Sequence, residues 1–191
     1  KISESNAISY YKMGEAKVGV NKKEIVIGIS PGFGTKIFQT LAGHKLSKVL
    51  KNLCDGIKRG GFSIRVVRLL HTADTSFLGL SAARLSGSGI GIGIQAKGTA
   101  VIHQADRLPH NNLELFSNAP ITKLNHYEGM GFNSTVYAKG ELPDPIVVPT
   151  KGEALGARYH ATVALIYNIE TSMLKDQEQP IEIKINLKEQ N

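Results

Sequence analysis

The residues that first suggest chemistry lie in the glycine-rich stretch LSGSGIGIGIQAKG, which runs from Leu85 to Gly98. Glycines followed by a lysine can wrap a phosphate, because backbone N–H groups and an ammonium bind its oxygens. A P-loop requires glycine directly before the lysine, whereas here Ala96 precedes Lys97. A dinucleotide fingerprint requires a third glycine at the position of Ile92. The stretch therefore matches neither phosphate-binding motif.

Its regular feature is the alternation of glycine with isoleucine from Gly89 to Ile94. Successive side chains of a strand point to opposite faces, so one face would be apolar and the other nearly bare. Glycine weakens a strand interior unless another backbone or a ligand must approach closely. Two interpretations follow. Either a helix packs on the bare face, which the pattern alone favours, or that face is a flat surface for a broad ligand or a partner subunit, with Lys97 at its edge.

Two other patterns that could support catalysis fail on chemical grounds. The segment GISPG, residues 28–32, matches the G-x-S-x-G motif of hydrolase nucleophiles. In that motif the residue after the serine donates its N–H to the oxyanion hole, but here it is Pro31, which has none. Ser30 is therefore interpreted as a turn residue. The six histidines lack H-x-x-x-H or H-E-x-x-H spacing, so we expect no metal site built by this chain.

Composition limits the class of protein further. The chain has 191 residues, 41% hydrophobic and 20% charged, as expected for one globular domain. No apolar run approaches the roughly 18 residues that a membrane span needs. Cys54 is the only cysteine, which excludes intrachain disulfides and favours the cytoplasm. The net charge of +7 is scattered, so we expect an anionic ligand or an acidic partner rather than nucleic acid.

The elements that must position these residues begin with a strand–helix–strand unit. Strands are expected at Glu24–Ser30 and Ser63–Leu70, and apolar residues at helical spacing predict a helix over His44–Lys58 between them. Strands joined through a helix are expected to be parallel. Further helices are predicted over residues 75–85 and 121–141, and further strands over residues 89–95 and 99–104.

The two ends of the chain are expected to be peripheral to this unit. Residues 1–23 are polar and poorly patterned, which indicates an N-terminal arm. Residues 161–170 and 180–187 flank a charged turn and are predicted to add C-terminal strands. The sequence thus predicts a single α/β domain over residues 24–191 with no internal boundary.

The segment LSGSGIGIGIQAKGTAVIHQ, followed by NLELF and AP, closely resembles the medium (beta) subunit of adenosylcobalamin-dependent diol and glycerol dehydratases. The resemblance runs from residue 24 to residue 141 and more loosely into the C-terminal strands. It implies a Rossmann-like domain with a mostly parallel central sheet. It also implies large and small partner subunits, assembled with this one as a dimer of heterotrimers.

In such a lyase, propane-1,2-diol or glycerol becomes an aldehyde plus water by a radical mechanism. The resemblance implies that the large subunit holds the substrate, its bound cation and the radical chemistry, while the medium subunit helps to bind adenosylcobalamin. We therefore expect no catalytic residue in this chain, no activity in isolation, and a location in the cytoplasm or in a bacterial microcompartment there. No contact with a membrane or nucleic acid is expected.

The family's cofactor contacts correspond to three residues here, namely Asp74, Lys97 and Asn112. Lys97 suits a phosphate oxygen or an amide carbonyl, because an ammonium offers three donors. Two more positions line the cofactor in relatives as leucine and proline, and they correspond to His110 and Ser117. The fit beneath the nucleotide tail is therefore expected to differ from that of relatives.

One alternative hypothesis shares the fold. The small subunit of the dehydratase-reactivating factor resembles the medium subunit, and the reactivating factor is also an expected partner of the dehydratase. This chain keeps the segments IQAKGTAVIHQ and NLELF, which resemble the catalytic complex. The dehydratase subunit is therefore the leading hypothesis.

Overall fold

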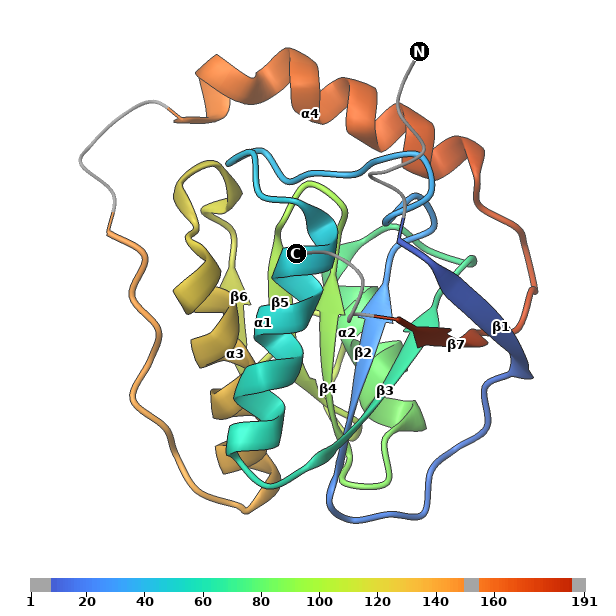
Figure 1. Ribbon diagram of the computed structural model, residues 1–191, viewed down its shortest axis with the longest axis vertical. Coiled ribbons are helices and arrows are strands. Elements are labelled where there is room, and N and C mark those ends of the chain that lie inside the picture. The colour runs from blue at the N-terminus through green and yellow to red at the C-terminus, as the bar shows by residue number, and fades with distance from the viewer. Residues whose placement is uncertain (1–7, 150–154, 187–191) are drawn as a thin grey trace.

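A seven-stranded sheet in the order β1-β7-β3-β2-β4-β5-β6 organises the computed structural model, which describes residues 8–149 and 155–186 (Figure 1). The strands are β1 (Tyr10–Glu15), β2 (Glu24–Ile29), β3 (Ser63–Arg68), β4 (Ile90–Ile94), β5 (Ala100–Gln104), β6 (Glu114–Phe116) and β7 (Ile181–Ile185). The helices are α1 (Leu46–Arg59), α2 (Thr75–Leu85), the short 3-10 helix η2 (Ala119–Ile121), α3 (Leu124–Ala138) and α4 (Leu155–Ser172).

Only the centre of the sheet is parallel. Strand β2 pairs in parallel with β3 and with β4, which confirms the predicted strand–helix–strand unit around α1. The other neighbours, β4 with β5, β5 with β6, β3 with β7 and β1 with β7, are antiparallel. The expected mostly parallel, Rossmann-like sheet is therefore wrong. The turn between β4 and β5 is too short for the crossover that parallel strands require.

The chain ends also differ from expectation. Residues 161–170, predicted as a strand, lie within α4. A short apolar run does not distinguish strand from helix, whereas the inward spacing of Tyr159, Val163, Ile166 and Glu170 is helical. The predicted C-terminal strand is confirmed as β7 up to residue 185. Within the expected N-terminal arm, β1 forms an edge of the sheet, while residues 1–7 lie outside the described part.

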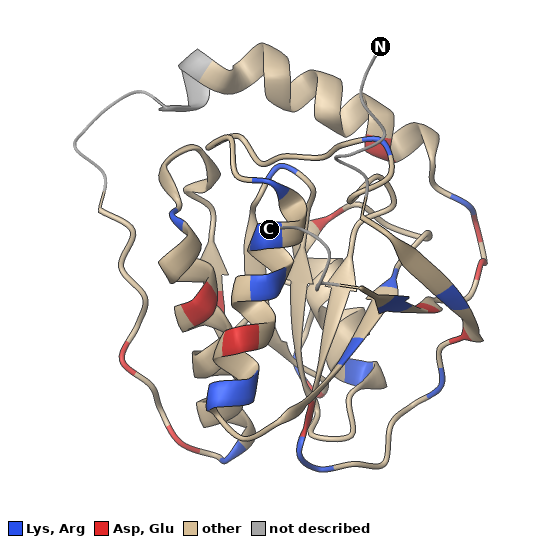
Figure 2. Cartoon of the chain, in the orientation of Figure 1, with Lys and Arg blue, Asp and Glu red and all other residues tan. Residues whose placement is uncertain are grey.

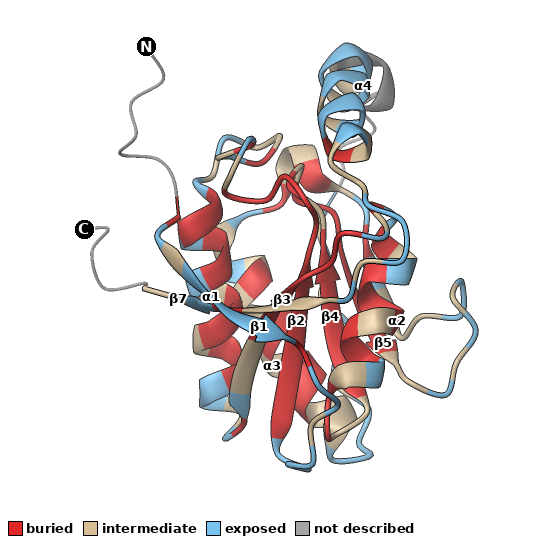
Figure 3. Cartoon of the chain, turned by 90° about the vertical axis from the view of Figure 1, so that its right-hand side faces the viewer, coloured by how far each residue is buried: buried red, intermediate tan, exposed pale blue. Residues whose placement is uncertain are grey.

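The core lies on both faces of the sheet. Helices α1 and α3 cover one face and α2 covers the other (Figure 3). The predicted helical periodicity of α1 is confirmed, because its apolar residues are fully buried. Helices α1 and α3 touch through backbone: a Cβ on Gly56 would lie 1.9 Å from the carbonyl oxygen of Glu128, and one on Gly131 would lie 2.1 Å from that of Leu53.

The glycine face of β4 is covered by α2. A Cβ on Gly91 would lie 2.3 Å from the backbone nitrogen of Ala83, and one on Gly93 would lie 2.2 Å from that of Gly79. No real Cβ comes so close to backbone atoms, so the helix sits where side chains would otherwise stand. The helix-packing interpretation is confirmed. The ligand-platform interpretation is wrong for these two glycines, because neither is accessible to a ligand.

Charged residues are scattered along the described chain, whereas most of α4 lacks them (Figure 2). No Asp, Glu, Lys or Arg occurs between Tyr159 and Ile169. Leu165 and Tyr167 are nonetheless 66% and 61% exposed. Among the described residues no helix is both long enough and apolar enough to traverse a bilayer.

We predict that Gly93→Ala lowers the free energy of unfolding by about 1–3 kcal/mol, because the new methyl group forces the α2 backbone away from β4. Gly129→Ala is the matched control. Its Cβ would meet only the flexible tip of Ile146, and alanine favours a helix interior over glycine by about 1 kcal/mol. Urea unfolding of the three proteins checks the prediction, which fails if Gly93→Ala is as stable as the control.

The single cysteine provides a probe of the core. Cys54 lies buried in α1, and burial raises the pKa of its thiol to about 11. Two pKa units lower the thiolate fraction near neutral pH by about 100-fold. We expect iodoacetamide to label Cys54 only as the chain unfolds, at a rate that follows global unfolding in denaturant. Rapid labelling of the native protein, followed by mass spectrometry, would contradict this packing.

Candidate functional site

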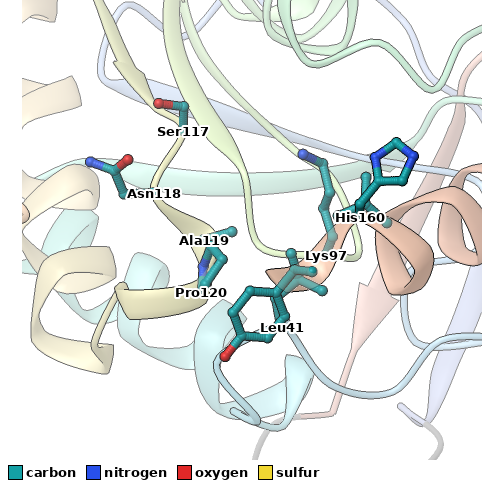
Figure 4. A pocket seen from close by; sticks show the side chains of 9 residues that line it. Leu41, Lys97, Ser117, Asn118, Ala119, Pro120 and His160 are labelled. Atoms are coloured by element: carbon teal, nitrogen blue, oxygen red, sulfur yellow. The ribbon is translucent and has the colours of Figure 1, made fainter. Parts of the chain in front are cut away.

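A cleft of about 360 Å³ lies beneath the N-terminal half of α4 (Figure 4). Its walls come from the loop before α1, the turn between β4 and β5, the segment from β6 into η2, and α4 itself. The lining residues are Leu41, Lys97, Ser117, Asn118, Ala119, Pro120, Tyr159, His160 and Val163. Two of the predicted site residues, Lys97 and Ser117, therefore meet in one cleft.

Backbone hydrogen bonds fasten the turn that carries Lys97. The N–H of Gly98 donates to the carbonyl of Gln95 at 2.9 Å, and the N–H of Leu41 donates to the carbonyl of Lys97 at 3.0 Å. The buried hydroxyl of Tyr127 donates to the carbonyl of Gly98 at 2.8 Å. The Lys97 backbone is thus tied to α3 and to the loop before α1. Its side chain is partly buried, and this burial lowers the pKa of Lys97 from its ordinary value.

The opposite wall follows β6. Ser117 and Asn118 lie across the cleft from Lys97 and His160 in Figure 4. The carbonyl of Asn118 accepts the hydroxyl of Thr122 at 2.8 Å, which shapes the chain as it enters η2. The cleft thus combines an ammonium, a hydroxyl, an amide and an imidazole with apolar surface. Such a mixture suits an organic ligand that carries a negative charge or amide groups.

The remaining predicted site residues do not line this cleft. Asp74 caps α2, since its carboxylate accepts the N–H of Phe77 at 3.1 Å. His110 is exposed, and its ring meets that of Phe77 edge-on with 6.0 Å between centroids. Asn112 is half-buried in the loop before β6. Ligand contacts by these three residues stay predictions.

The two regions are nevertheless joined by one hydrogen bond. The Gln95 side-chain amide donates to the carbonyl of Ala73 at 2.6 Å, which connects the Lys97 turn to the residue before Asp74. A ligand large enough to span both regions would therefore meet a continuous, internally bonded edge of the domain.

Ser30 is structural, as its turn position indicates. It is fully buried, its hydroxyl donates to the carboxylate of Glu170, and its oxygen accepts the N–H of Ala96 at 3.1 Å. Among the described residues, three His, Cys, Asp or Glu side chains nowhere gather closely enough to hold a metal ion.

Sequence reasoning missed the contribution of α4. Tyr159, His160 and Val163 line the cleft, and Glu170 anchors the same helix. The spacing of the histidines gives His160 no metal-binding role, and residues 161–170, which follow it, are predicted to form a strand. The spacing of Tyr159, Val163, Ile166 and Glu170 was the available signal, because residues four, three and four apart share one helix face.

The α/β domain thus carries a cleft lined by the ammonium of Lys97 and, on the facing wall, by Ser117 and Asn118. Residues 30–144, more than half of the chain, match the family model of the dehydratase medium subunit. The chain therefore belongs to the dehydratase medium subunit family. The matched region contains both Lys97 and Ser117.

Solved structures add a likeness of fold. A glycerol dehydratase reactivase superposes with a TM-score of 0.51 and 21% identity, over 68% of this chain and 97% of that chain. A diol dehydratase-reactivating factor complexed with ADP and Mg2+ gives a TM-score of 0.48 and 16% identity, over 66% of this chain and 97% of that chain. At such identity the likeness concerns fold alone. The family match thus favours the dehydratase subunit over the reactivase hypothesis.

We predict that Lys97 titrates below the ordinary lysine pKa of 10.5, because partial burial disfavours its charged form. A bound anion favours that charged form, so binding raises the Lys97 pKa and takes up a proton at pH values above the free-state midpoint. Anion affinity should fall as pH rises through that midpoint. Titration of the Lys97 side-chain carbon by NMR, assigned with Lys97→Met, tests this, and a midpoint at or above 10.5 would contradict it.

Proposed function

We propose that this chain is the medium subunit of an adenosylcobalamin-dependent diol or glycerol dehydratase and that it helps to bind the cofactor. The observation that carries the proposal is the family match over residues 30–144, a region that contains Lys97 and Ser117, which line the same cleft. Membership of the family indicates the class of reaction, and the cleft is the place where this chain would bind part of the cofactor.

The residues of the cleft fit part of such a cofactor. Its described lining contains no carboxylate. An ammonium and the Ser117 hydroxyl suit phosphate oxygens or amide carbonyls of the nucleotide tail. A volume of about 360 Å³ accommodates only a portion of so large a molecule. This supports a site shared with a second subunit.

The proposed division of labour leaves binding and orientation to this chain. When bound, adenosylcobalamin supplies the radical chemistry. Lys97 donates to the negatively charged end of the ligand, and Ser117 and Asn118 offer hydrogen bonds from the facing wall. Tyr159 and Val163 add apolar surface to the same cleft. On this proposal the isolated chain is inactive.

The proposed assembly contains a large and a small subunit besides this one, as a dimer of heterotrimers in the cytoplasm. The large subunit would hold propane-1,2-diol or glycerol together with the substrate-bound cation. The exposed, uncharged length of α4 supports such an assembly, because Leu165 and Tyr167 resemble interface residues more than a solvated surface.

We expect the chain to co-purify with large and small dehydratase subunits when the three are co-expressed. The complex should convert propane-1,2-diol or glycerol to an aldehyde only when adenosylcobalamin is added. Lys97→Ala should weaken cobalamin affinity about tenfold, which is about 1.4 kcal/mol, while the complex stays assembled. Lys48→Ala, on the exposed side of α1, is the matched control and should bind cobalamin as the wild type does.

Two results would overturn this proposal. Stable pairing of the chain with an ATPase, with exchange of damaged cobalamin, would favour the small subunit of a reactivating factor. Unchanged cobalamin affinity in Lys97→Ala, in a complex whose composition is confirmed, would remove this cleft from the cofactor site.

A further inference from the structure

Helix α4 is attached to the domain in an unusual way. It lies across the end of the sheet where β2 and β4 finish (Figures 1 and 3). Of its described side chains, Tyr159 to Ser172, only Glu170 is buried, with 3% of its surface exposed. A helix usually packs through an apolar stripe, but the most deeply buried side chain here is a carboxylate.

The Glu170 carboxylate lies among polar groups at the end of β2. One of its oxygens accepts the hydroxyl of Ser30, and the other accepts the N–H of Gly32 at 2.5 Å. Ser30 is itself fixed, because its oxygen accepts the N–H of Ala96 at 3.1 Å. These partners come from the ends of two neighbouring strands. The carboxylate therefore ties α4 to β2 directly and to β4 through one intermediate.

The turn that binds Glu170 is itself stabilised by hydrogen bonds from Arg68. The buried guanidinium of Arg68 donates to the carbonyls of Pro31 and Phe33, at 2.9 Å each. Burial raises the pKa of Glu170, while hydrogen bonding by the Ser30 hydroxyl and by the backbone of Gly32 and Ala96, together with the charge of Arg68, acts in the opposite direction. Desolvating a carboxylate is costly, so its placement here requires these compensating partners.

Anchoring Glu170 orients the whole inner face of α4. Tyr159, Val163 and Ile166 lie on the same side of the helix as Glu170, at distances of 11, 7 and 4 residues along the chain. A small cavity of about 30 Å³ separates the Glu170 end from the main cleft, and Lys97 lines both. Rotation or lifting of the helix at Glu170 would therefore move the wall that faces Lys97.

We propose that Glu170 is a positioning residue for the Lys97 cleft: it fastens α4 so that Tyr159, His160 and Val163 close the cleft, and it acts through the helix without touching the ligand. The attachment of α4 by Glu170 is inferred from contacts within this chain, whereas the identity of the ligand as cobalamin rests on the proposed function. We therefore expect the affinity of the cleft for its ligand to depend on Glu170, although Glu170 is not among the residues that line the cleft.

The first test measures α4 itself in the full chain. Glu170→Ala should accelerate hydrogen exchange of the α4 amides at least about tenfold, while the amides of β2, β4 and α1 keep their wild-type rates. Ser30→Ala, which removes one donor to the carboxylate, should accelerate them less. Asn168→Ala is the matched control on the exposed side of the same helix and should leave them unchanged.

Glu170→Gln is a second, milder variant that keeps the test decisive if Glu170→Ala fails to fold. It keeps the shape of the side chain but replaces one acceptor oxygen by a donor, so α4 exchange should rise by less than in Glu170→Ala. If Glu170→Ala loosens the whole domain, Glu170→Gln decides the question. Exchange in α4 that stays at the wild-type rate in Glu170→Gln and Ser30→Ala would overturn the fastening role.

The second test measures adenosylcobalamin binding by the assembled complex. Glu170→Ala should raise the apparent KM for adenosylcobalamin about fivefold to tenfold and leave kcat at saturating cofactor unchanged, as expected for lost ground-state binding. Looser α4 exchange with unchanged affinity, where Lys97→Ala does weaken binding, would overturn the positioning role and leave the proposed function intact. Unchanged affinity in both variants would instead refute the proposed cofactor site. The hydrogen-exchange rates of the α4 amides alone would then decide whether Glu170 fastens the helix.

Discussion

The close approach of α2 to β4 is the constraint on which the rest of the domain depends. Gly91 and Gly93 carry no side chain on the face where the backbone of α2 lies, so helix and strand meet at distances that no Cβ allows. The isoleucines of β4 consequently fill the opposite face, toward α1 and α3. Because β4 is held in this way at the centre of the sheet, its carboxyl end delivers Lys97 to a defined place.

The end of the sheet is organised differently from its interior. The faces of β2 and β4 are covered by apolar packing, whereas α4 is attached through the buried carboxylate of Glu170 and its bonds to Ser30 and Gly32. Hydrogen bonds to a carboxylate require a particular geometry, while apolar contacts tolerate sliding. A polar anchor therefore orients α4 with little buried surface, and it leaves Leu165 and Tyr167 exposed.

Much of the domain could be predicted from local patterns. The helical spacing in α1 and the parallel pairing of β2 with β3 follow from periodicity and from the length of the connection. The resemblance named the family that the match over residues 30–144 later showed. It also selected Lys97 and Ser117, which share the cleft, together with Asp74, which the structure shows to cap α2.

The sequence by itself determined which segments are apolar, where glycines permit close approach, and which family the chain belongs to. Only the tertiary structure decided that β7 pairs antiparallel with β1 and β3, since β7 comes from the far end of the chain. It also decided that Glu170 meets Ser30 across 140 positions of sequence. Such contacts depend on how distant elements stack, which no local periodicity encodes.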